Sequence, residues 1–214
     1  MAIVDLVESA PDDLPQHLKE HLPQAALRAE ANAAQAQARF AADFVVLRRQ
    51  LRSLTTAKVP SAGRGIRLRH LAAEWSRMVS TTAACRRGCS HCCHIDVLLP
   101  RSEAMLIGKA IGVMPVEPAR THRVEQASAV QDFVGTPCPF LEQGRCGIYG
   151  QRPTVCRLLV NLDDSELLCE LVPNMQVPVP YANSTEIKAL FVLLHLQEDF
   201  ADVREWFPAG RARP

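Results

Sequence analysis

The sequence predicts a mainly α fold: a small, irregular, cysteine-rich metal-binding domain with packed helices and at most short strands. Three observations lead to this prediction. Apolar residues recur at helical spacing in several segments, and no segment alternates strongly enough to support a large sheet. All eight cysteines lie between Cys85 and Cys169. Apolar residues make up 48% of the chain and charged residues 22%, so a core can form and wholesale disorder is excluded.

Three parts are expected along the 214 residues. Residues 1–65 form an N-terminal helical extension and linker, residues 66–182 the cysteine-cluster metal-binding domain, and residues 183–214 a C-terminal helix that packs on the domain. Within the extension, residues 24–54 have apolar side chains at helical spacing and predict an amphipathic helix. Pro23 suits the start of that helix, because the N–H that proline lacks is free at this position.

Local composition places the other elements. Residues 55–65 combine Pro, Gly, Ser and Thr and predict a linker. The segment Asn183–Glu186 has capping-box character and opens the C-terminal helix. Further helices are expected at about 66–79, 101–111 and 118–133, and short strands at 95–99 and 158–162.

Charge and hydropathy exclude several classes of protein. Lys and Arg total 24 against 23 Asp and Glu, and the net charge of +1 argues against nucleic-acid binding through bulk positive charge. No apolar stretch approaches the roughly 20 residues of a membrane-spanning helix, so no membrane association is expected. The N-terminus carries acids instead of a basic start and an apolar run, which argues against a secretory signal. We therefore expect a cytoplasmic protein whose thiols serve as metal ligands or redox groups.

The first cysteine group spans Cys85–His94 and holds four thiols in nine residues. A soft metal favours such a dense set, because thiolates supply both negative charge and covalent character. Gly88 allows the backbone to turn between the donors. Arg86 and Arg87 are cations that would lower the pKa of neighbouring thiols.

The second cysteine group contains Cys138, Cys146 and Cys156. Gly144 is expected to make the turn that brings Cys138 and Cys146 together. Pro153 is placed to begin a short helix, and the dipole at its N-terminus would favour the thiolate of Cys156. Four apolar residues are expected to shield the site from water: Phe140, Leu141, Ile148 and Tyr149.

Four motifs occur in order along the chain: Cys-x3-Cys-x2-Cys-Cys, Cys-Pro-Phe-Leu, Cys-x-Ile-Tyr and Arg-Pro-x-x-Cys-Arg. In this order they resemble the YkgJ-type cysteine-cluster family of zinc- or iron-chelating proteins. The resemblance covers Cys85 to Arg157 and implies a metal or iron–sulfur site in mostly bacterial, cytoplasmic proteins. By position, the implied metal ligands are Cys85, Cys89, Cys92, Cys93, Cys138, Cys146 and Cys156.

The same resemblance bears on two further residues. It places an acidic residue at Glu103, where a negative charge also suits the first turn of the expected helix. Cys169 lies outside the motifs and is expected to be a structural or free thiol. A related arrangement occurs in flagellin lysine methylases, which implies an alternative function as a cluster-dependent enzyme of redox or methyl-transfer chemistry.

Seven thiols permit more than one metal arrangement. One cluster could take four cysteines and leave three, two sites could form with one completed by His91, His94 or water, or two metals could share a bridging thiolate. Adjacent Cys92 and Cys93 tend to point apart and so could serve different sites. The cofactor expected from these donors is an iron–sulfur cluster, of [4Fe-4S] type, or Zn²⁺.

Two functions follow from the sequence. The first is a metal-binding module without catalytic activity of its own, and the second is the cluster-dependent enzyme. The chain has no Gly-rich nucleotide loop and no Ser–His–Asp set that can be placed from the sequence, which favours the module. The N-terminal helices pack on the domain or dock on a protein partner.

Overall fold

The computed structural model describes residues 3–56, 61–86, 88–124 and 131–210. Helices dominate these residues and the strands are short, which confirms the predicted mainly α class. No helix of the described residues is long and apolar enough to cross a membrane. The α-helices are α1 (Ile3–Glu8), α2 (Gln16–Arg39), α3 (Ala41–Thr56), α4 (Ser61–Val79), α5 (Arg101–Ile111), α7 (Thr154–Leu158), α8 (Thr185–Leu194) and α9 (Val203–Trp206).

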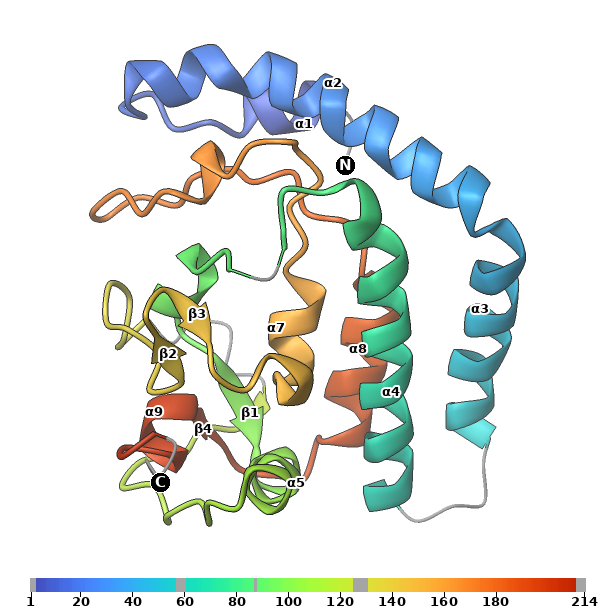
Figure 1. Ribbon diagram of the computed structural model, residues 1–214, viewed down its shortest axis with the longest axis vertical. Helices are drawn as coiled ribbons and strands as arrows, with labels where there is room; N and C mark the ends of the chain where they lie inside the picture. Colours follow the sequence, from blue (N-terminus) through green and yellow to red (C-terminus); the bar gives the residue numbers. More distant parts are fainter. Residues whose placement is uncertain (1–2, 57–60, 87, 125–130, 211–214) are drawn as a thin grey trace.

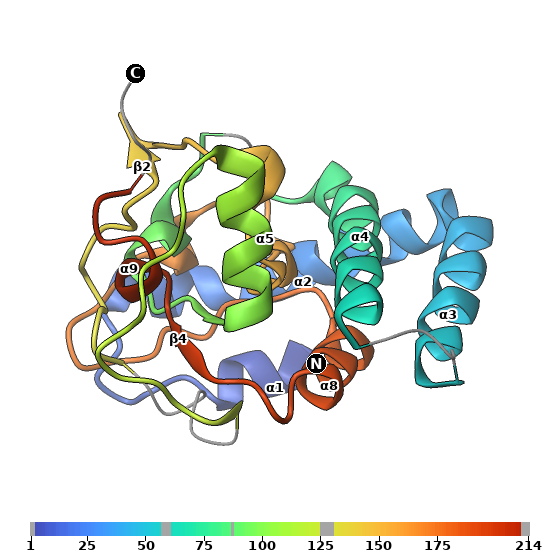
Figure 2. The same ribbon diagram turned by 90° about the horizontal axis from the view of Figure 1, so that it is seen from below.

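The strands form two antiparallel pairs. In the first, β1 (Leu98–Pro100) pairs with β4 (Phe200–Asp202), so the C-terminal segment returns to the chain that directly follows the first cysteine group (Figure 1). Figure 2 shows β4 between the segment after α8 and α9. In the second, β2 (Leu141–Glu142) and β3 (Arg145–Cys146) form a small hairpin within the second group. The short 3-10 helices are η1 (Ser80–Thr82), η2 (His91–His94), η3 (Tyr149–Gln151) and η4 (Leu167–Cys169).

The N-terminal helices bend around the rest of the molecule. Figure 1 shows α2 crossing above the segment that includes η4, and α3 descending beside α4. The predicted single helix over 24–54 is in fact two helices that meet at Phe40, and Pro23 lies inside α2. Proline removes only one backbone hydrogen bond there, and the buried Leu18 and Leu22 hold the helix against an apolar cluster that includes Leu168.

The expected linker over 55–65 is helical at both of its ends. Residues 57–60 lie outside the described residues, but α3 continues to Thr56 and α4 already begins at Ser61. Gly65 therefore lies within a helix, where a Cβ atom would stand 3.2 Å from Nε2 of His195. Because glycine has no side chain, α4 can approach the segment after α8 closely at this position.

Three other predicted elements differ from the structure. Residues 118–123 are irregular, with His122 bridging to Phe200, and Phe133 lies in a turn, so the helix predicted over 118–133 is wrong at both of its ends, whereas Val124 is helical. Residues 125–130 lie outside the described residues. Residues 158–162 contain only one isolated bridge in place of a strand. Ser184 precedes α8 without capping it through its side chain, because Asn183 Oδ1 accepts the N–H of Thr185 instead.

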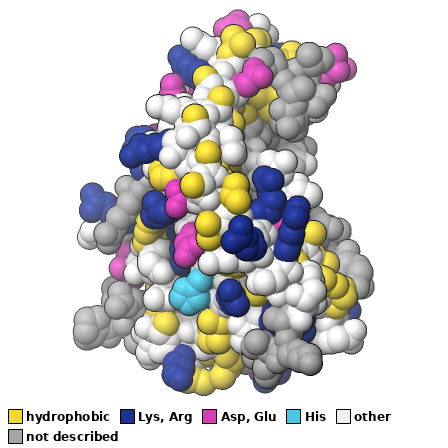
Figure 3. Space-filling view, turned by 90° about the vertical axis from the view of Figure 1, so that its right-hand side faces the viewer, with side chains coloured by type: hydrophobic (Ala, Val, Ile, Leu, Met, Phe, Trp, Pro, Cys, Tyr) yellow, Lys and Arg dark blue, Asp and Glu magenta, His cyan; other side chains and the backbone are white. Residues whose placement is uncertain are grey.

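The outer face of α3 carries charged and apolar side chains together. Figure 3 shows this side of the molecule, where Lys and Arg are interspersed with acidic and hydrophobic residues. Val45 and Val46 on α3 are among the exposed hydrophobic residues. A protein partner for these helices stays a prediction.

Candidate metal centre

Three apolar clusters surround the cysteines. The largest, built mainly from α3, α4 and α8, contacts Cys85. The second, which includes Phe140, Ile148 and Trp206, contacts Cys138, Cys146 and Cys156. The third, between α2 and the segment around Leu168, contacts Cys169. Five of the thiols thus pack against apolar clusters, and all eight cysteines are half-buried and free of disulfide bonds.

Backbone hydrogen bonds bring the two cysteine groups together. The N–H of Cys138 donates to the carbonyl of Cys93 at 2.7 Å, and the N–H of Gly135 donates to the carbonyl of His94 at 2.7 Å. These bonds join the end of the first group to the start of the second. The hairpin β2–β3 then returns Cys146 to the same region through a turn at Gln143 and Gly144, both with positive φ.

Electrostatic coupling divides the thiols into two sets of four. In what we call the first thiol set, every pair of thiolates repels, and this repulsion helps to raise the pKa of Cys85, Cys89 and Cys169. In the second thiol set the same holds for five of the six pairs. The first thiol set is Cys85, Cys89, Cys92 and Cys169, and the second thiol set is Cys93, Cys138, Cys146 and Cys156.

The two sets are linked through Cys92, which repels the thiolates of Cys146 and Cys156 in the second set as well as those of its own set. The Cys93 thiol donates a hydrogen bond to the sulfur of Cys92, and this bond lowers the pKa of Cys92 to about 7. In the described part of the chain, no three His, Cys, Asp or Glu side chains stand close enough around one point to hold a metal ion. The sulfur atoms are gathered within electrostatic range, but they are spread more widely than a single ion requires.

Backbone amides point at three of the sulfur atoms in the same local pattern. The thiols of Cys89, Cys138 and Cys146 each accept the N–H of the residue two positions later, namely His91, Phe140 and Ile148. Each bond lowers the pKa of its thiol, because a hydrogen bond to the thiolate favours the charged form. Amide–sulfur bonds of this kind surround metal-bound thiolates and tune the metal.

Burial opposes ionisation at most of the thiols. Desolvation is the largest cause that raises the pKa of Cys85 and of Cys138 to about 11. It also raises the pKa of Cys156 well above its ordinary value, so the expected lowering by the helix dipole is outweighed there. A positive charge inside the site is therefore needed to hold several thiolates at neutral pH.

Arg152 supplies part of this positive charge. It lowers the pKa of Cys85 and Cys92 in the first thiol set and of Cys146 and Cys156 in the second. Its guanidinium stands 4.0 Å from the centre of the Tyr149 ring, and its buried Nε has no hydrogen-bond partner. Sequence reasoning pointed to Arg86 and Arg87 for this role. Arg86 lowers only the pKa of Cys89 among these thiols and pairs with exposed Glu166 at 3.5 Å, and Arg87 lies outside the described residues.

Glu103 is buried and contacts the helix that carries Cys156 of the second thiol set. It lies in the first turn of α5 as predicted, but its Oε1 accepts both the N–H and the hydroxyl of Thr154, at 2.8 and 2.7 Å. This carboxylate therefore caps α7, the helix that carries Cys156. Arg69 Nε lies 3.4 Å from the same oxygen.

Cys169 is an eighth candidate thiol, which sequence reasoning left outside the motifs as a structural or free thiol. In the structure η4 places it in the first thiol set, with its sulfur 3.5 Å from Nδ2 of Asn161. Its only signal in the sequence is the even total of eight cysteines, which two four-thiol sites require. His91 is the first residue of η2 and His94 the last. The backbone N–H of His91 donates to the thiol of Cys89, and the carbonyl of His94 accepts the N–H of Gly135.

A polar cavity opens beside the first thiol set. Its volume is about 470 Å³ and it reaches Cys89, the thiol nearest to solvent on this side. Both signs of charge line it. The lining residues are Arg86, Gly88, Cys89, Ser90, His91, Gln143, Gly144, Arg145 and Glu166.

Comparison with known families matches part of the chain to a family model. Residues 84–173 match the family model described as "CxxCxxCC: Putative zinc- or iron-chelating domain". The matched span contains all eight cysteines, including Cys169. No curated protein and no solved structure matches the chain significantly.

Proposed function

We propose that residues 84–173, which match the model of this family of zinc- or iron-chelating domains, bind metal through two four-thiol sites. The observation that carries the proposal is the division of the eight cysteines into two sets. The first thiol set gathers three cysteines of the first group with Cys169, and the second gathers Cys93 with the three cysteines of the second group. Adjacent Cys92 and Cys93 serve different sites.

The donors fit a cationic centre. Four thiolates close a structural zinc site, and four cysteines also hold an iron–sulfur cluster. Either occupant would offset the repulsion and desolvation that raise the thiol pKa values. The amide–sulfur bonds at Cys89, Cys138 and Cys146 and the cation of Arg152 already favour thiolate.

A zinc ion and an iron–sulfur cluster require different spacings of the sulfur atoms that bind them. With Zn–S bonds of about 2.3 Å, four ligating sulfur atoms stand roughly 3.8 Å apart. In a four-iron cluster each thiolate binds a different iron atom, so the sulfur atoms stand farther apart. The described thiols interact electrostatically, but no three of them surround one point, so they would have to move closer together to bind a single zinc ion.

Anaerobic purification followed by metal and acid-labile sulfide analysis tests this proposal. Two four-iron clusters would give about eight iron and eight sulfide per chain and a brown protein. If about two zinc ions per chain are found without sulfide, the two four-thiol sites are supported and their occupant is zinc instead of an iron–sulfur cluster. Neither metal nor sulfide in carefully prepared protein would refute both sites.

An enzymatic role for the first site has one supporting observation. The polar cavity reaches Cys89, so a substrate or an exchangeable ligand could approach this set while the second set is walled by Phe140 and Ile148. We therefore keep a cluster-dependent redox or methyl-transfer activity as the second candidate. A small-molecule ligand that changes the spectrum of the metal-loaded protein, and loses this effect when Arg145 is replaced by Glu, would favour it.

A further inference from the structure

A buried asparagine joins two sulfur atoms of the first thiol set. Asn161 is fully buried, its backbone N–H donates to Cys85 Sγ at 3.2 Å, and its side-chain Nδ2 donates to Cys169 Sγ at 3.5 Å. Cys85 and Cys169 come from distant parts of the sequence. One residue therefore orients both and places partial positive charge beside each sulfur atom.

The orientation of the Asn161 amide is set by its own partners. Its Oδ1 accepts the N–H of Asp163 at 2.9 Å, and its Nδ2 also donates to the carbonyl of Ser165 at 3.0 Å. The Oδ1 contact requires the oxygen to face Asp163, so the nitrogen faces the sulfur. Asp163 further accepts the N–H of Ala84 through its carbonyl at 2.7 Å, directly before Cys85.

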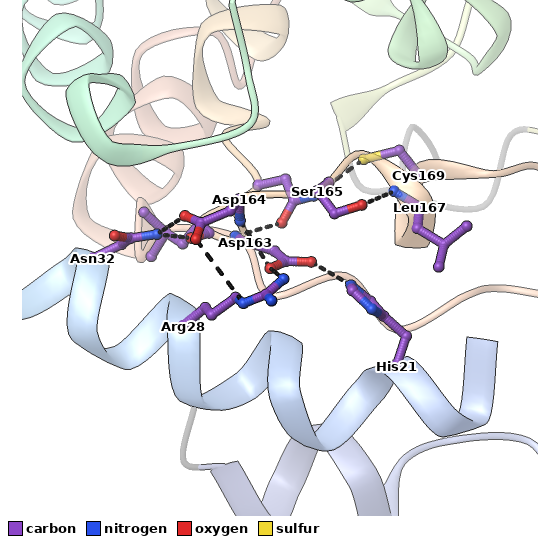
Figure 4. Close-up of polar contacts among 10 residues, drawn as sticks. His21, Arg28, Asn32, Asp163, Asp164, Ser165, Leu167 and Cys169 are labelled. Carbon is purple, nitrogen blue, oxygen red and sulfur yellow. Dashed lines mark hydrogen bonds and ion pairs between the residues drawn. The ribbon is translucent and has the colours of Figure 1, made fainter. Parts of the chain in front are cut away.

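Helix α2 holds this turn from the outside (Figure 4). His21 Nε2 contacts Asp163 Oδ2 at 2.6 Å, and the Asp163 side chain is fully buried. Arg28 Nη1 lies 3.7 Å from the other oxygen of the same carboxylate. One turn along α2, Asn32 Nδ2 donates to the carbonyl of Leu162 at 2.8 Å. Three side chains of the N-terminal extension thus contact the turn that carries Asn161.

We propose that Asn161 is a positioning residue for the first metal site, and that α2 controls ligation by Cys169 through the contact of His21 with Asp163. This inference rests on the proposed function, since it concerns one of its two sites. The N-terminal helices then act as part of the metal site. Release of α2 from Asp163 frees the Asn161 turn and weakens the hold on Cys169.

Asn161→Asp tests the positioning role. The carboxylate keeps an acceptor for Asp163 N–H but loses the donor to Cys169 and places negative charge beside the thiolate. In metal-loaded protein we expect alkylation of Cys169 to become about tenfold faster or more, and the absorption or EPR signal of the first site to shift. Cys138 in the second set stays protected and shows that the fold is retained.

A pair of histidine variants tests the control by α2. His21→Leu removes the contact with buried Asp163. His17→Leu removes a contact of the same type between α2 and Glu170, at 3.2 Å, but the side chains of that pair are 55% and 50% exposed. We expect faster alkylation of Cys169 in His21→Leu alone, because an exposed pair contributes little.

The outcomes separate the two proposals. If metal does not protect Cys169 in the wild-type protein, the first site itself is wrong. If metal protects Cys169 but Asn161→Asp leaves its alkylation and the spectrum unchanged, Asn161 is not a positioning residue. Equal effects of His17→Leu and His21→Leu would overturn the role of Asp163. Should His21→Leu lose Cys138 protection, Asp163→Asn, which keeps the shape of the side chain, takes its place and decides by the same measurement. Should Asn161→Asp lose it, Asn161→Leu, which removes the donor without adding charge, takes its place.

Discussion

The buried carboxylate of Glu103 accepts the backbone N–H of Thr154 at 2.8 Å, across 51 residues of sequence. Thr154 is the first residue of α7, and Cys156 follows two positions later. A helix N-terminus has N–H groups without intrahelical partners, and a carboxylate satisfies them and favours the dipole. The contact therefore fixes the backbone that presents a thiol of the second set.

Removal of this cap should loosen the second site. We expect Glu103→Ala to lower the free energy of unfolding by about 2 kcal/mol, because buried donors lose their partner. Glu103→Gln keeps an acceptor oxygen and should cost less. Urea unfolding of the metal-loaded variants measures both values, and equal losses in the two variants would contradict a capping role.

The same residue predicts a dependence of stability on pH. Burial raises the pKa of Glu103 above its ordinary value of 4.5. A group with a raised pKa in the folded state stabilises the fold below the unfolded value, and this contribution is lost as the pH rises through the folded value. The stability of the wild-type protein relative to Glu103→Gln should therefore fall as the pH rises from 4.5 toward neutrality. If the unfolding free energies of the wild-type protein and of Glu103→Gln change in parallel across this range, titration of Glu103 does not affect stability.

Cys92 should be the most reactive thiol of the metal-free protein near neutral pH. The hydrogen bond from Cys93 lowers the pKa of Cys92 to about 7, whereas the pKa of Cys85 is raised to about 11. Because the thiolate is the nucleophile, its alkylation rate should rise through pH 7. Cys93→Ala should move this profile to higher pH, and Cys93→Ser, which keeps a donor, should move it less. Alkylation followed by peptide mass spectrometry across pH gives both profiles.

Loss of one thiol from each set should remove one centre and spare the other. We expect Cys169→Ser to lower the metal content by about half, since a four-thiol site loses a ligand. Cys146→Ser should do the same through the second set, and the double variant should bind almost no metal. Metal content measured per chain decides this, and a fully loaded Cys169→Ser protein would place Cys169 outside the site.

Arg152 should matter through its charge. Arg152→Gln removes the cation that lowers the pKa of thiols in both sets, so metal binding should weaken by roughly tenfold, while Arg152→Lys should retain most of it. Exposed Arg145→Gln is the matched control, with little change expected. Competition with a chromophoric chelator gives the affinities. Equal weakening by Gln and Lys would point to stacking on Tyr149 in place of charge.

Local patterns in the sequence predicted much of the architecture. Helical spacing located α4, α5 and α8, because each helix buries one stripe of its own residues. Pro23 misled the prediction of where α2 begins, because buried Leu18 and Leu22 extend the helix past a lost hydrogen bond. The helix over 118–133 was overpredicted, since contacts of His122 with β4 hold its described start in an irregular form.

By itself, the sequence determined the mainly α class and the two dense cysteine groups, since periodicity and thiol density are properties of neighbouring residues. Only the tertiary structure decided how the eight thiols divide, that Cys169 joins the first set, and that Arg152 lowers the pKa of thiols in both sets. Asn161 contacts Cys85 across 76 residues and His21 contacts Asp163 across 142. Such contacts arise when apolar clusters pack distant segments together, and no local spacing encodes them.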